Sequence, residues 1–537
     1  MNDQHNRAIT RAGWVTLTLV SLTQLLSLLD RQILAILSPR IKQDLNIGDA
    51  EMGLLYGTVF ALFYATFSLP LGRLADGWKR TKLLALCIAV WSLATGSAAF
   101  ATGFGLLALS RLGVGIGEAA AQPAGTSLVY DHFPKARRGL AMAVMAAAIA
   151  LGLGLSNLLG GVAADWWDQL HPQGPGGLGF SGWQFAFLIA ALPGIGLALL
   201  LSRLPEPQRG AIDGLVPVHD PAPFRASADL FAAILPGSNW LAMARQRAST
   251  RQWLANLGGL LALVVAGTLA AHWCAALSPR PPLQLGGVTI SPHALQWGVV
   301  GFGLYVLFNL VQSLRTTDPV AHAVITRSPA LLLCMAVGSL QSLINYGIMG
   351  FTPAFLMKTY HLTATETGLK FGLLSAGLGV VGPLISGPLS DLLNRRLPGA
   401  GRVWVVVFAL GLSPLLAMWV YSAPTAGQFY QRFVAYSLVL TMWLPPLYAV
   451  MFEQVLPRMR AITASTYIVI MTIVGLGIGP YAVGLMSDAA GGNLGVAILS
   501  INWVSPLIVL LLLVLARRAS RDEASLSARA RAAGEPV

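Results

Sequence analysis

The chain has 537 residues, of which 55% are hydrophobic and only 11% are charged. A soluble protein carries about 25% charged residues, so this composition indicates a polytopic membrane protein. The net charge of +13 does not indicate nucleic-acid binding, because the basic residues recur in short segments between apolar runs. The three cysteines lie in separate apolar runs, so we expect neither a disulfide framework nor a metal site.

Apolar runs bounded by charged residues, glycine or proline predict fourteen membrane spans, each near the roughly 20 residues that a span needs. The first six runs are at 14–37, 50–74, 82–101, 105–130, 139–162 and 183–203. Two more follow a polar segment, at 254–277 and 296–315. The last six are at 328–350, 366–390, 401–422, 429–453, 459–485 and 495–516.

These runs predict an all-α polytopic membrane protein with two six-helix bundles and an inserted transmembrane hairpin. The expected parts are an N-terminal bundle at 1–205 and a central linker, with the two inserted helices, at 206–327. A C-terminal bundle at 328–518 and a disordered cytoplasmic tail at 519–537 follow. We expect disorder in the tail because it is small and polar.

The distribution of basic residues predicts the orientation. If the spans alternate, most of the 35 Lys and Arg residues fall on the side of the N-terminus. Cytoplasmic loops carry such an excess, so we expect both termini in the cytoplasm. This excess of Lys and Arg on one side of the membrane holds only if both inserted runs cross the membrane or if neither does. The expected location is a cell membrane, the bacterial inner membrane, with multiple passes.

The span at 105–130 contains Arg111 and Glu118 in the stretch Arg-Leu-Gly-Val-Gly-Ile-Gly-Glu. Each charge costs roughly 2.5–3.5 kcal/mol at the centre of a bilayer, so it needs a partner or water. Seven residues make two helical turns of about 10 Å, which places both side chains on one face. This face is predicted to line a polar cavity.

The first span carries two further charges, Asp30 and Arg31. Asp30 and Arg111 are at similar depths in their spans, so we expect them to meet. Intramembrane charges mark functional sites by default. We therefore predict that Asp30 and Glu118 carry protons and that Arg31 and Arg111 bind substrate. The alternative is a static cluster of charges that only holds the helices together.

Polar residues in the second half suggest another wall of the cavity. Asn345 and Tyr346, together with Gln341, form a polar face at helical spacing, and Tyr448 follows a pair of prolines. We predict that Asn345, Tyr346 and Tyr448 bind substrate. The alternative for Tyr448 is a part in a helix bend.

An internal repeat links the two halves. Gly72-Arg-Leu-Ala-Asp76, with Arg80 after it, ends the second span, and Gly387-Pro-Leu-Ser-Asp391, with Arg395 after it, ends the corresponding span of the second half. Duplicated six-helix bundles related by an axis along the membrane normal are typical of major facilitator transporters.

The Gly72…Asp76…Arg80 loop resembles the signature loop of the major facilitator superfamily, and the resemblance covers nearly the whole chain. The loop departs from the usual pattern at Gly77 and Lys79. The resemblance implies a cytoplasmic latch between the halves, in which an aspartate faces a helix N-terminus. We predict gating roles for four residues: Asp76, Arg80, Asp391 and Arg395. The alternative is that they only set the topology.

Within this superfamily the sequence resembles the Spinster-like branch. The resembling stretches are Leu29-Asp-Arg-Gln32, Arg111–Glu118, Asp131–Gly139, Tyr346-Gly347 and Leu456–Ala461. The resemblance implies a secondary transporter; relatives with known cargo move lysophospholipids or sphingoid lipids, and proton coupling has been proposed for them. The family has twelve spans, so the inserted pair is a departure.

The expected function is therefore secondary active transport of an amphipathic or anionic, lysolipid-like substrate by alternating access, coupled to protons. The alternatives are an uptake permease for a small organic or sugar acid, a drug efflux pump, or a transporter-like sensor or scaffold. An enzyme is not expected, because the repeated bundles hold no histidine in their spans and no nucleotide-binding loop occurs. We expect a monomer among membrane lipids, with no cofactor and no nucleic-acid partner.

Overall fold

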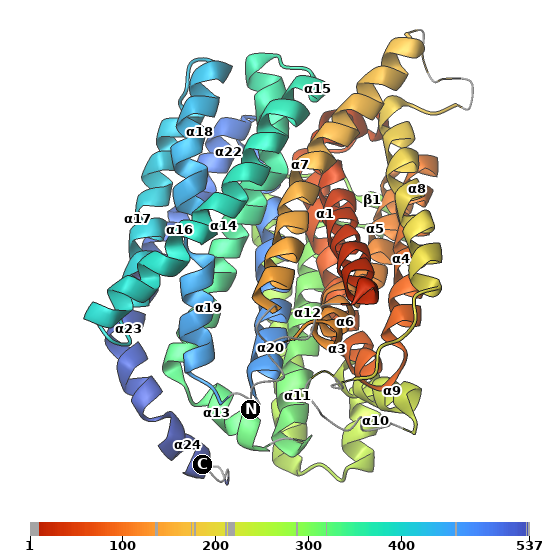
Figure 1. The fold of residues 1–537 in the computed structure, drawn as a ribbon. Helices are drawn as coiled ribbons and strands as arrows, with labels where there is room; N and C mark the ends of the chain where they lie inside the picture. The colour runs from red at the N-terminus through yellow and green to blue at the C-terminus, as the bar shows by residue number, and fades with distance from the viewer. Residues whose placement is uncertain are drawn as a thin grey trace. The chain divides into compact units, whose positions relative to one another are not determined.

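The structure is a computed structural model of the chain (Figure 1). It describes residues 10–534 apart from 135–137, 173, 175, 177–178, 210–211, 213–220, 286–287, 318, 457–458 and 533. Parts of two stretches that carry the Spinster-like resemblance, at 135–137 and 457–458, therefore lie outside the described residues.

The first part of the chain is helical throughout. Its elements are α1 (Arg11–Leu45), α2 (Asp49–Gly53), η1 (Leu54–Thr58), α3 (Val59–Gly77), α4 (Arg80–Ser97), η2 (Ala98–Phe100), α5 (Phe104–Glu118), α6 (Ala121–His132), α7 (Arg138–Leu170) and α8 (Gly182–Ser202). The central part comprises α9 (Pro223–Ile234), α10 (Ser238–Arg245), α11 (Thr250–Leu277), β1 (Leu283–Leu285), β2 (Val288–Ile290), α12 (Pro292–Thr317) and α13 (Pro319–Thr326).

The second half begins with α14 (Pro329–Tyr360), α15 (Ala364–Thr367), η5 (Gly368–Gly372), α16 (Leu373–Arg396), α17 (Gly401–Tyr421), α18 (Ala426–Thr441) and α19 (Leu444–Glu453). It ends with α20 (Arg460–Met471), η7 (Thr472–Leu476), α21 (Gly477–Ala489), α22 (Leu494–Ser500), η8 (Ile501–Val504), α23 (Ser505–Ala524) and α24 (Leu526–Ala532). β1 and β2 form a small antiparallel hairpin with Leu283 opposite Ile290.

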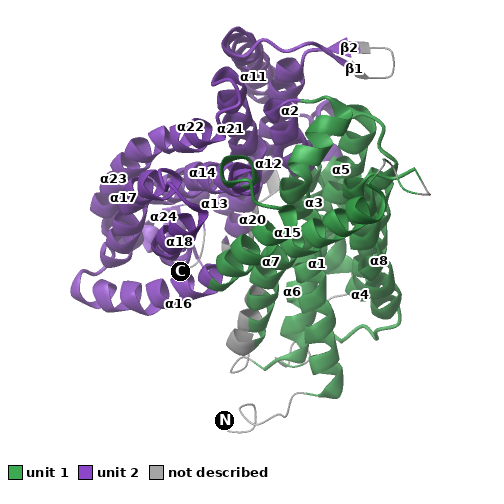
Figure 2. Cartoon of the chain, turned by 90° about the horizontal axis from the view of Figure 1, so that it is seen from above, with its two compact units in different colours: residues 1–47, 63–231, 357–377 green, residues 48–62, 232–356, 378–537 purple. Residues whose placement is uncertain are grey.

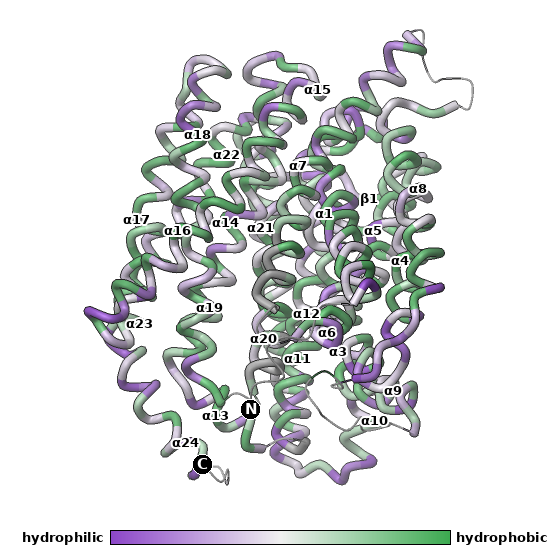
Figure 3. Tube along the Cα trace, in the orientation of Figure 1, coloured by the Kyte–Doolittle hydropathy of each residue, from purple (hydrophilic) through white to green (hydrophobic). Residues whose placement is uncertain are grey.

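The prediction of an all-α polytopic membrane protein is confirmed. Within the described residues, 14 helices are long and apolar enough to cross a membrane, two of them from the inserted pair. Large apolar side chains are exposed along these helices, for example Leu93 on α4, Leu109 on α5 and Leu415 on α17. Figure 3 shows hydrophobic colouring along the helices. Lipid is the solvent that favours such a surface.

Several membrane spans are interrupted. η1, η5 and η7 are π-helical turns, and the span that contains Glu118 breaks at 119–120, between α5 and α6. π-turns and broken helices occur frequently at functional sites of membrane proteins. η1 follows α2 directly and η5 follows α15 directly, so the interruption recurs at corresponding places of the two halves.

The described chain forms two compact units (Figure 2). Unit 1 contains residues 1–47, 63–231 and 357–377, and unit 2 contains residues 48–62, 232–356 and 378–537. Each unit thus includes a short segment of the other sequence half. The expected domain boundaries at 205/206 and 327/328 describe the sequence repeat and stay predictions.

The expected disorder of the tail is wrong for most of its length. α23 continues to Ala524, and α24 covers Leu526–Ala532. Alanine, leucine and arginine are good helix formers, which a reading of polarity alone neglects. The tail is also held in place, because Asp522 Oδ2 accepts the backbone N–H of Ala330 at 2.7 Å and Ala530 is buried.

Candidate functional site

A buried ion pair joins α1 and α5 inside unit 1. Arg31 Nη2 lies 2.7 Å from Glu118 Oε2, and the Glu118 side chain is 0% exposed. Ser27 Oγ, one turn before Arg31 on α1, donates to the same carboxylate oxygen at 2.7 Å. The Arg31 guanidinium also lies 5.1 Å from the centroid of the Tyr64 ring. The Arg31 guanidinium thus has a charge-assisted hydrogen bond and a cation–π contact, and Glu118 Oε2 accepts from both Arg31 and Ser27.

Asp30 and Arg111 are in contact as predicted, but the contact is with the backbone of Asp30 rather than with its carboxylate. Arg111 Nη1 donates to the backbone oxygen of Asp30 at 3.1 Å, and both residues are buried. The Asp30 carboxyl lies beside the side chains of Thr95 and Trp91 on α4. The four predicted charges are therefore brought together by α1 and α5, and Glu118 pairs with Arg31.

Two carboxyl oxygens of this cluster lack a hydrogen bond to any described residue: Asp30 Oδ1 and Glu118 Oε1. A buried polar group without a partner is costly, so such atoms call for a proton, water or a ligand. The observation is compatible with the predicted proton-coupling residues. A static cluster would be expected to satisfy all of its oxygens from within the protein.

The three residues predicted as the other cavity wall belong to unit 2. Asn345 Oδ1 on α14 accepts from Gln341 Nε2 at 2.9 Å, and Asn345 and Tyr346 are partly buried. Tyr448 on α19 contacts Tyr467 on α20, with 5.4 Å between the ring centroids. Tyr467, which the sequence did not single out, is buried beside both Tyr448 and Tyr346.

Arg80 is the best-connected of the predicted gating residues. Its guanidinium is 1% exposed, and it pairs with Asp131 on α6 and with Glu206 beyond α8. It also donates to Ser127 Oγ at 2.7 Å and to the backbone oxygen of Pro207 at 3.3 Å. Arg80 thus holds three segments of unit 1 together.

Asp76 and Asp391 lie at exposed helix ends. Arg209 donates to the backbone oxygens of Ala75, Asp76 and Trp78 and so caps the C-terminal end of α3. Asp391 pairs with Arg402 at the start of α17 at 3.0 Å, and Arg402 also binds Glu453 at the end of α19. The basic partner of Asp391 is thus Arg402, from the next helix.

Two further aspartates bind helix N-termini, which the sequence reading did not identify. In unit 1, Asp165 Oδ2 on α7 accepts from the backbone N and the hydroxyl of Thr365 at the start of α15, at 2.9 and 2.7 Å. Arg40 on α1 pairs with Asp165 and with Asp168. We name Arg40, Asp165 and Thr365 the first latch.

The second latch repeats this arrangement in unit 2. Asp488 on α21 accepts from the backbone N–H groups of Asp49 and Ala50 at the start of α2, at 3.2 and 2.9 Å. Arg280, from the segment between α11 and β1, pairs with Asp488. Asp488, Arg280 and the N-terminus of α2 (49–50) form this second latch. A carboxylate at a helix N-terminus is stabilised by the helix dipole and by charge-assisted hydrogen bonds.

A sequence signal for the latches does exist. Thr363 and Glu366 form a capping box at the start of α15, and at the start of α2 the Glu51 side chain accepts the backbone N–H of Gly48 at 3.0 Å. Both are followed by a glycine two residues after the glutamate, as a short internal repeat. The partner aspartates have no comparable motif, so only the fold identifies them.

The sequence pattern of the Major Facilitator Superfamily matches residues 20–314. The chain belongs to the major facilitator superfamily. It is a membrane transporter rather than an enzyme. An MFS-type efflux pump of Mycolicibacterium smegmatis is 26% identical over 495 residues, 92% of this chain and 89% of that protein. The sphingosine-1-phosphate transporter SPNS2 of Danio rerio is 31% identical over 206 residues, 38% of each chain.

Solved structures confirm the expected fold. A crystal structure of a bacterial homolog of the human lysosomal transporter Spinster, in an inward-facing and occupied conformation, matches with a TM-score of 0.63 and 21% identity. The match covers 98% of this chain and 97% of that one. The chain is thus similar in sequence to SPNS2 and in fold to this bacterial Spinster homolog, as the resemblance to the Spinster-like branch predicted.

Proposed function

We propose that this transporter moves an amphipathic, anionic molecule of the lysolipid class across the membrane by alternating access, coupled to protons. The observation that carries the proposal is the buried Arg31–Glu118 pair, together with the unpartnered oxygens Asp30 Oδ1 and Glu118 Oε1. SPNS2, a sphingosine-1-phosphate transporter, supports the class of cargo.

The cluster provides a physical route to coupling. When Glu118 is ionised, Arg31 is neutralised by it and offers little attraction to an anionic headgroup. When Glu118 is protonated, Arg31 loses its counter-charge and attracts the headgroup in a medium where charges interact strongly. The ionised Glu118 carboxylate and the anionic cargo thus compete for Arg31, and protonation of Glu118 decides between them. Arg111, which binds the backbone of Asp30, adds a second positive charge to the site. Asn345, Tyr346 and Tyr448 would contact the less polar part of the cargo.

Alternating access requires contacts that break on each side of the membrane. We infer from the basic residues near α10 and α24 that both termini face the cytoplasm. The two latches then lie on the opposite side and serve as outer gates. Asp76, Arg80, Asp391 and Arg395 belong to the cytoplasmic side, where Arg80 anchors the segment that follows α8.

The test is transport by the purified protein in proteoliposomes, with a lysophospholipid or sphingosine-1-phosphate as cargo and with or without a pH gradient. Glu118→Gln should abolish pH-driven accumulation and retain downhill exchange, because a glutamine cannot release a proton. Arg111→Ala should lose cargo binding itself. Asp229→Asn on α9 is the matched control, since Asp229 is exposed and outside the cluster. Full pH-driven accumulation by Glu118→Gln would leave Asp30 as the remaining proton carrier.

Drug efflux is the second candidate, because the mycobacterial relative that covers nearly the whole chain is an efflux pump. The same vesicles distinguish the two. Export of a cationic drug with no movement of lysolipid would favour efflux.

A further inference from the structure

We propose that the inserted hairpin of α11 and α12 binds one anionic phospholipid of the membrane. One of its two acyl chains lies in a groove between the two helices, and its phosphate lies at the arginines around the end of α10. This site is separate from the charge cluster of unit 1. It stands whether or not the cargo of the transporter is a lipid.

The groove has a volume of about 300 Å³ and is almost wholly apolar. It is lined by Leu260, Val264 and Ala271 of α11 and by Trp297, Gly301 and Phe302 of α12, among others. From 260 to 271 the helical rise gives a length of roughly 16 Å. One leaflet of the hydrocarbon core is about 15 Å thick, so the groove is as long as a lipid chain in one leaflet.

Glycines keep this groove open. A side chain at Gly298 would meet no protein atom within 4 Å, and one at Gly301 would meet only the backbone oxygen of Leu263, at 3.9 Å. Glycines in membrane helices usually allow close helix packing. At Gly298 and Gly301 the space next to the glycine is not filled by protein side chains, so an acyl chain of a membrane lipid can occupy it.

A buried polar cluster closes the end of the groove nearest α10. The hydroxyl of Tyr305, whose ring lines the groove, donates to Asn256 Oδ1 at 2.6 Å. Asn239 of α10 donates to the same hydroxyl and to Asn309 of α12, at 3.2 and 3.1 Å. This cluster fixes α10 to the hairpin and places polar groups at one end of the apolar groove.

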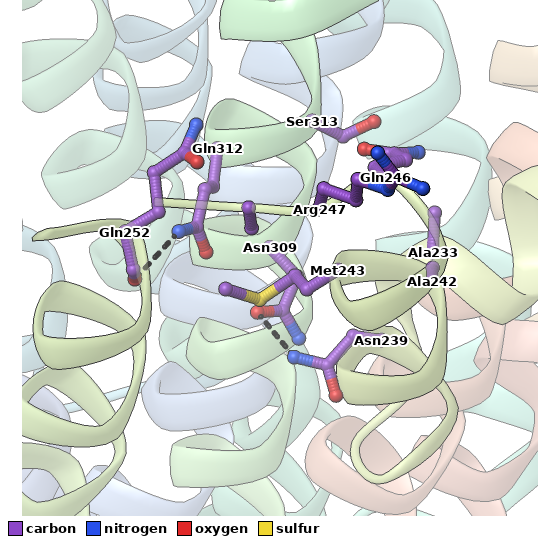
Figure 4. Close-up of a pocket in the computed structure, with 11 residues that line it drawn as sticks. Ala233, Asn239, Ala242, Met243, Gln246, Arg247, Gln252, Asn309, Gln312 and Ser313 are labelled. Atoms are coloured by element: carbon purple, nitrogen blue, oxygen red, sulfur yellow. Dashed lines mark hydrogen bonds between the residues drawn. The ribbon is translucent and has the colours of Figure 1, made fainter. Parts of the chain in front are cut away.

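A small pocket of about 90 Å³ adjoins the cluster, since Asn239 and Asn309 also line it (Figure 4). Asn309 and Gln312 of α12 line it, together with Gln246 and Arg247 from the segment after α10. Amide and guanidinium groups donate hydrogen bonds, which phosphate oxygens accept. An apolar groove therefore leads, through a hydroxyl and amides, to cationic donors.

The charge of this region is of one sign. The sequence holds no Asp or Glu between Asp229 and Asp318. Arg245, Arg247 and Arg251 are all exposed, and none is paired with a carboxylate of the described residues. Basic pockets beside membrane helices bind anionic lipid headgroups, with each arginine worth about 1 kcal/mol near a charged surface.

The backbone of Arg247 adds an independent observation. Its φ is 50°, a left-handed conformation directly after α10, and Ala248 N bonds back to the oxygen of Met243. Glycine or asparagine is usual at this position of a helix end, and other residues are strained there. A strained residue at a site is a reason to look for a function of its side chain. Arg247→Gly removes the cation and relieves the backbone, so a loss of binding cannot be ascribed to misfolding.

The experiment uses the full-length protein, stripped of lipid in detergent, with dioleoylphosphatidylglycerol added and the retained lipid measured by native mass spectrometry. We expect one tightly retained molecule. Arg247→Gly and Arg251→Gln should each weaken its retention about fivefold, the effect of one arginine. A double substitution, Gly298→Leu with Gly301→Leu, should abolish retention by filling the groove.

Controls separate this site from general lipid coating. Gly196→Leu places a leucine at another open glycine, on α8, and Arg521→Gln removes an exposed arginine from α23; neither should change retention. Equal retention of phosphatidylcholine, or loss that is as large in the two control variants, would overturn the proposal. Competition by soluble glycerol-3-phosphate as effective as that by the lipid would show a phosphate site instead and would also overturn it.

Discussion

Arg280 binds the carboxylate of Asp488 and thereby ties the inserted hairpin to the start of α2. Arg40 likewise binds the carboxylate of Asp165, which accepts from Thr365 at the start of α15. Arg40, however, comes from α1 of the ordinary bundle. The inserted hairpin thus supplies the second latch with the cation that a core helix supplies to the first. This is a structural use for a hairpin that the twelve-helix pattern lacks.

Arg280→Gln should loosen the second latch without unfolding the protein. The Arg280 guanidinium is about a quarter exposed, so we expect the free energy of unfolding to fall by about 1 kcal/mol or less. A cysteine placed at Met52, which is 2% exposed, should then react faster with a thiol reagent. Labelling of native cysteines will be low, because Cys87, Cys274 and Cys334 are buried. An unchanged rate at Met52→Cys would show that Arg280 does not hold α2.

The second latch should be insensitive to alkaline pH. Burial by itself lowers the pKa of Arg280, but the hydrogen bond and the charge of Asp488 outweigh it and raise the pKa. Because the folded-state pKa is raised, the stabilisation by the pair is complete below the ordinary arginine pKa and is lost only above it. The difference in melting temperature between the wild type and Arg280→Gln should therefore stay constant from neutral to mildly alkaline pH. A difference that shrinks over this range would contradict the expectation.

Asp165→Ala should release the N-terminus of α15. The carboxylate accepts both the N–H and the hydroxyl of Thr365, and loss of such a cap costs about 1–2 kcal/mol. Asp168→Ala is the matched control, since Asp168 also binds Arg40 but bonds to Gly182 rather than to α15. Thiol labelling at Ala364→Cys should rise in the first variant only. Equal labelling in both would mean that Arg40, and not the cap, secures α15.

Arg80→Ala should destabilise the protein strongly. It would leave the carboxylates of Asp131 and Glu206 without their shared cation, a loss on the order of 3 kcal/mol for a largely buried pair. Arg80→Lys keeps the positive charge but not the forked set of donors, so its stability should lie between that of the wild type and that of Arg80→Ala. Thermal unfolding followed by size-exclusion chromatography measures both. A melting temperature equal to that of the wild type in Arg80→Ala would leave only a role in gating.

Asp76→Asn tests the predicted cytoplasmic gate. Arg209 binds the backbone oxygen of Asp76, so the substitution spares that contact and removes only the carboxylate charge. The family resemblance implies that this carboxylate faces a helix N-terminus, where a charge is worth about 0.3–1 kcal/mol, so the variant should shift the protein toward the inward-open state. Accessibility labelling on the cytoplasmic side of proteoliposomes should increase modestly. No increase would remove Asp76 from the gate.

The sequence by itself determined the number of membrane helices, because hydropathy measures the cost of each segment in lipid. It also selected Asp30, Arg31, Arg111 and Glu118, since a charge in hydrocarbon needs a reason to be there. It did not determine partners. Helix rotation and choice of neighbour decided that Glu118 pairs with Arg31 and that Asp391 pairs with Arg402.

The two latches depended on tertiary structure alone. Asp165 and Asp488 look like ordinary polar residues near the ends of helices, while their partners lie some 200 to 440 residues away in the chain. Hydropathy and local propensity describe each helix in isolation, whereas a carboxylate on one helix and free N–H groups on another meet only through packing. Each helix start carries a glutamate that accepts a backbone N–H of its own first turn, but which aspartate binds it was decided by the fold.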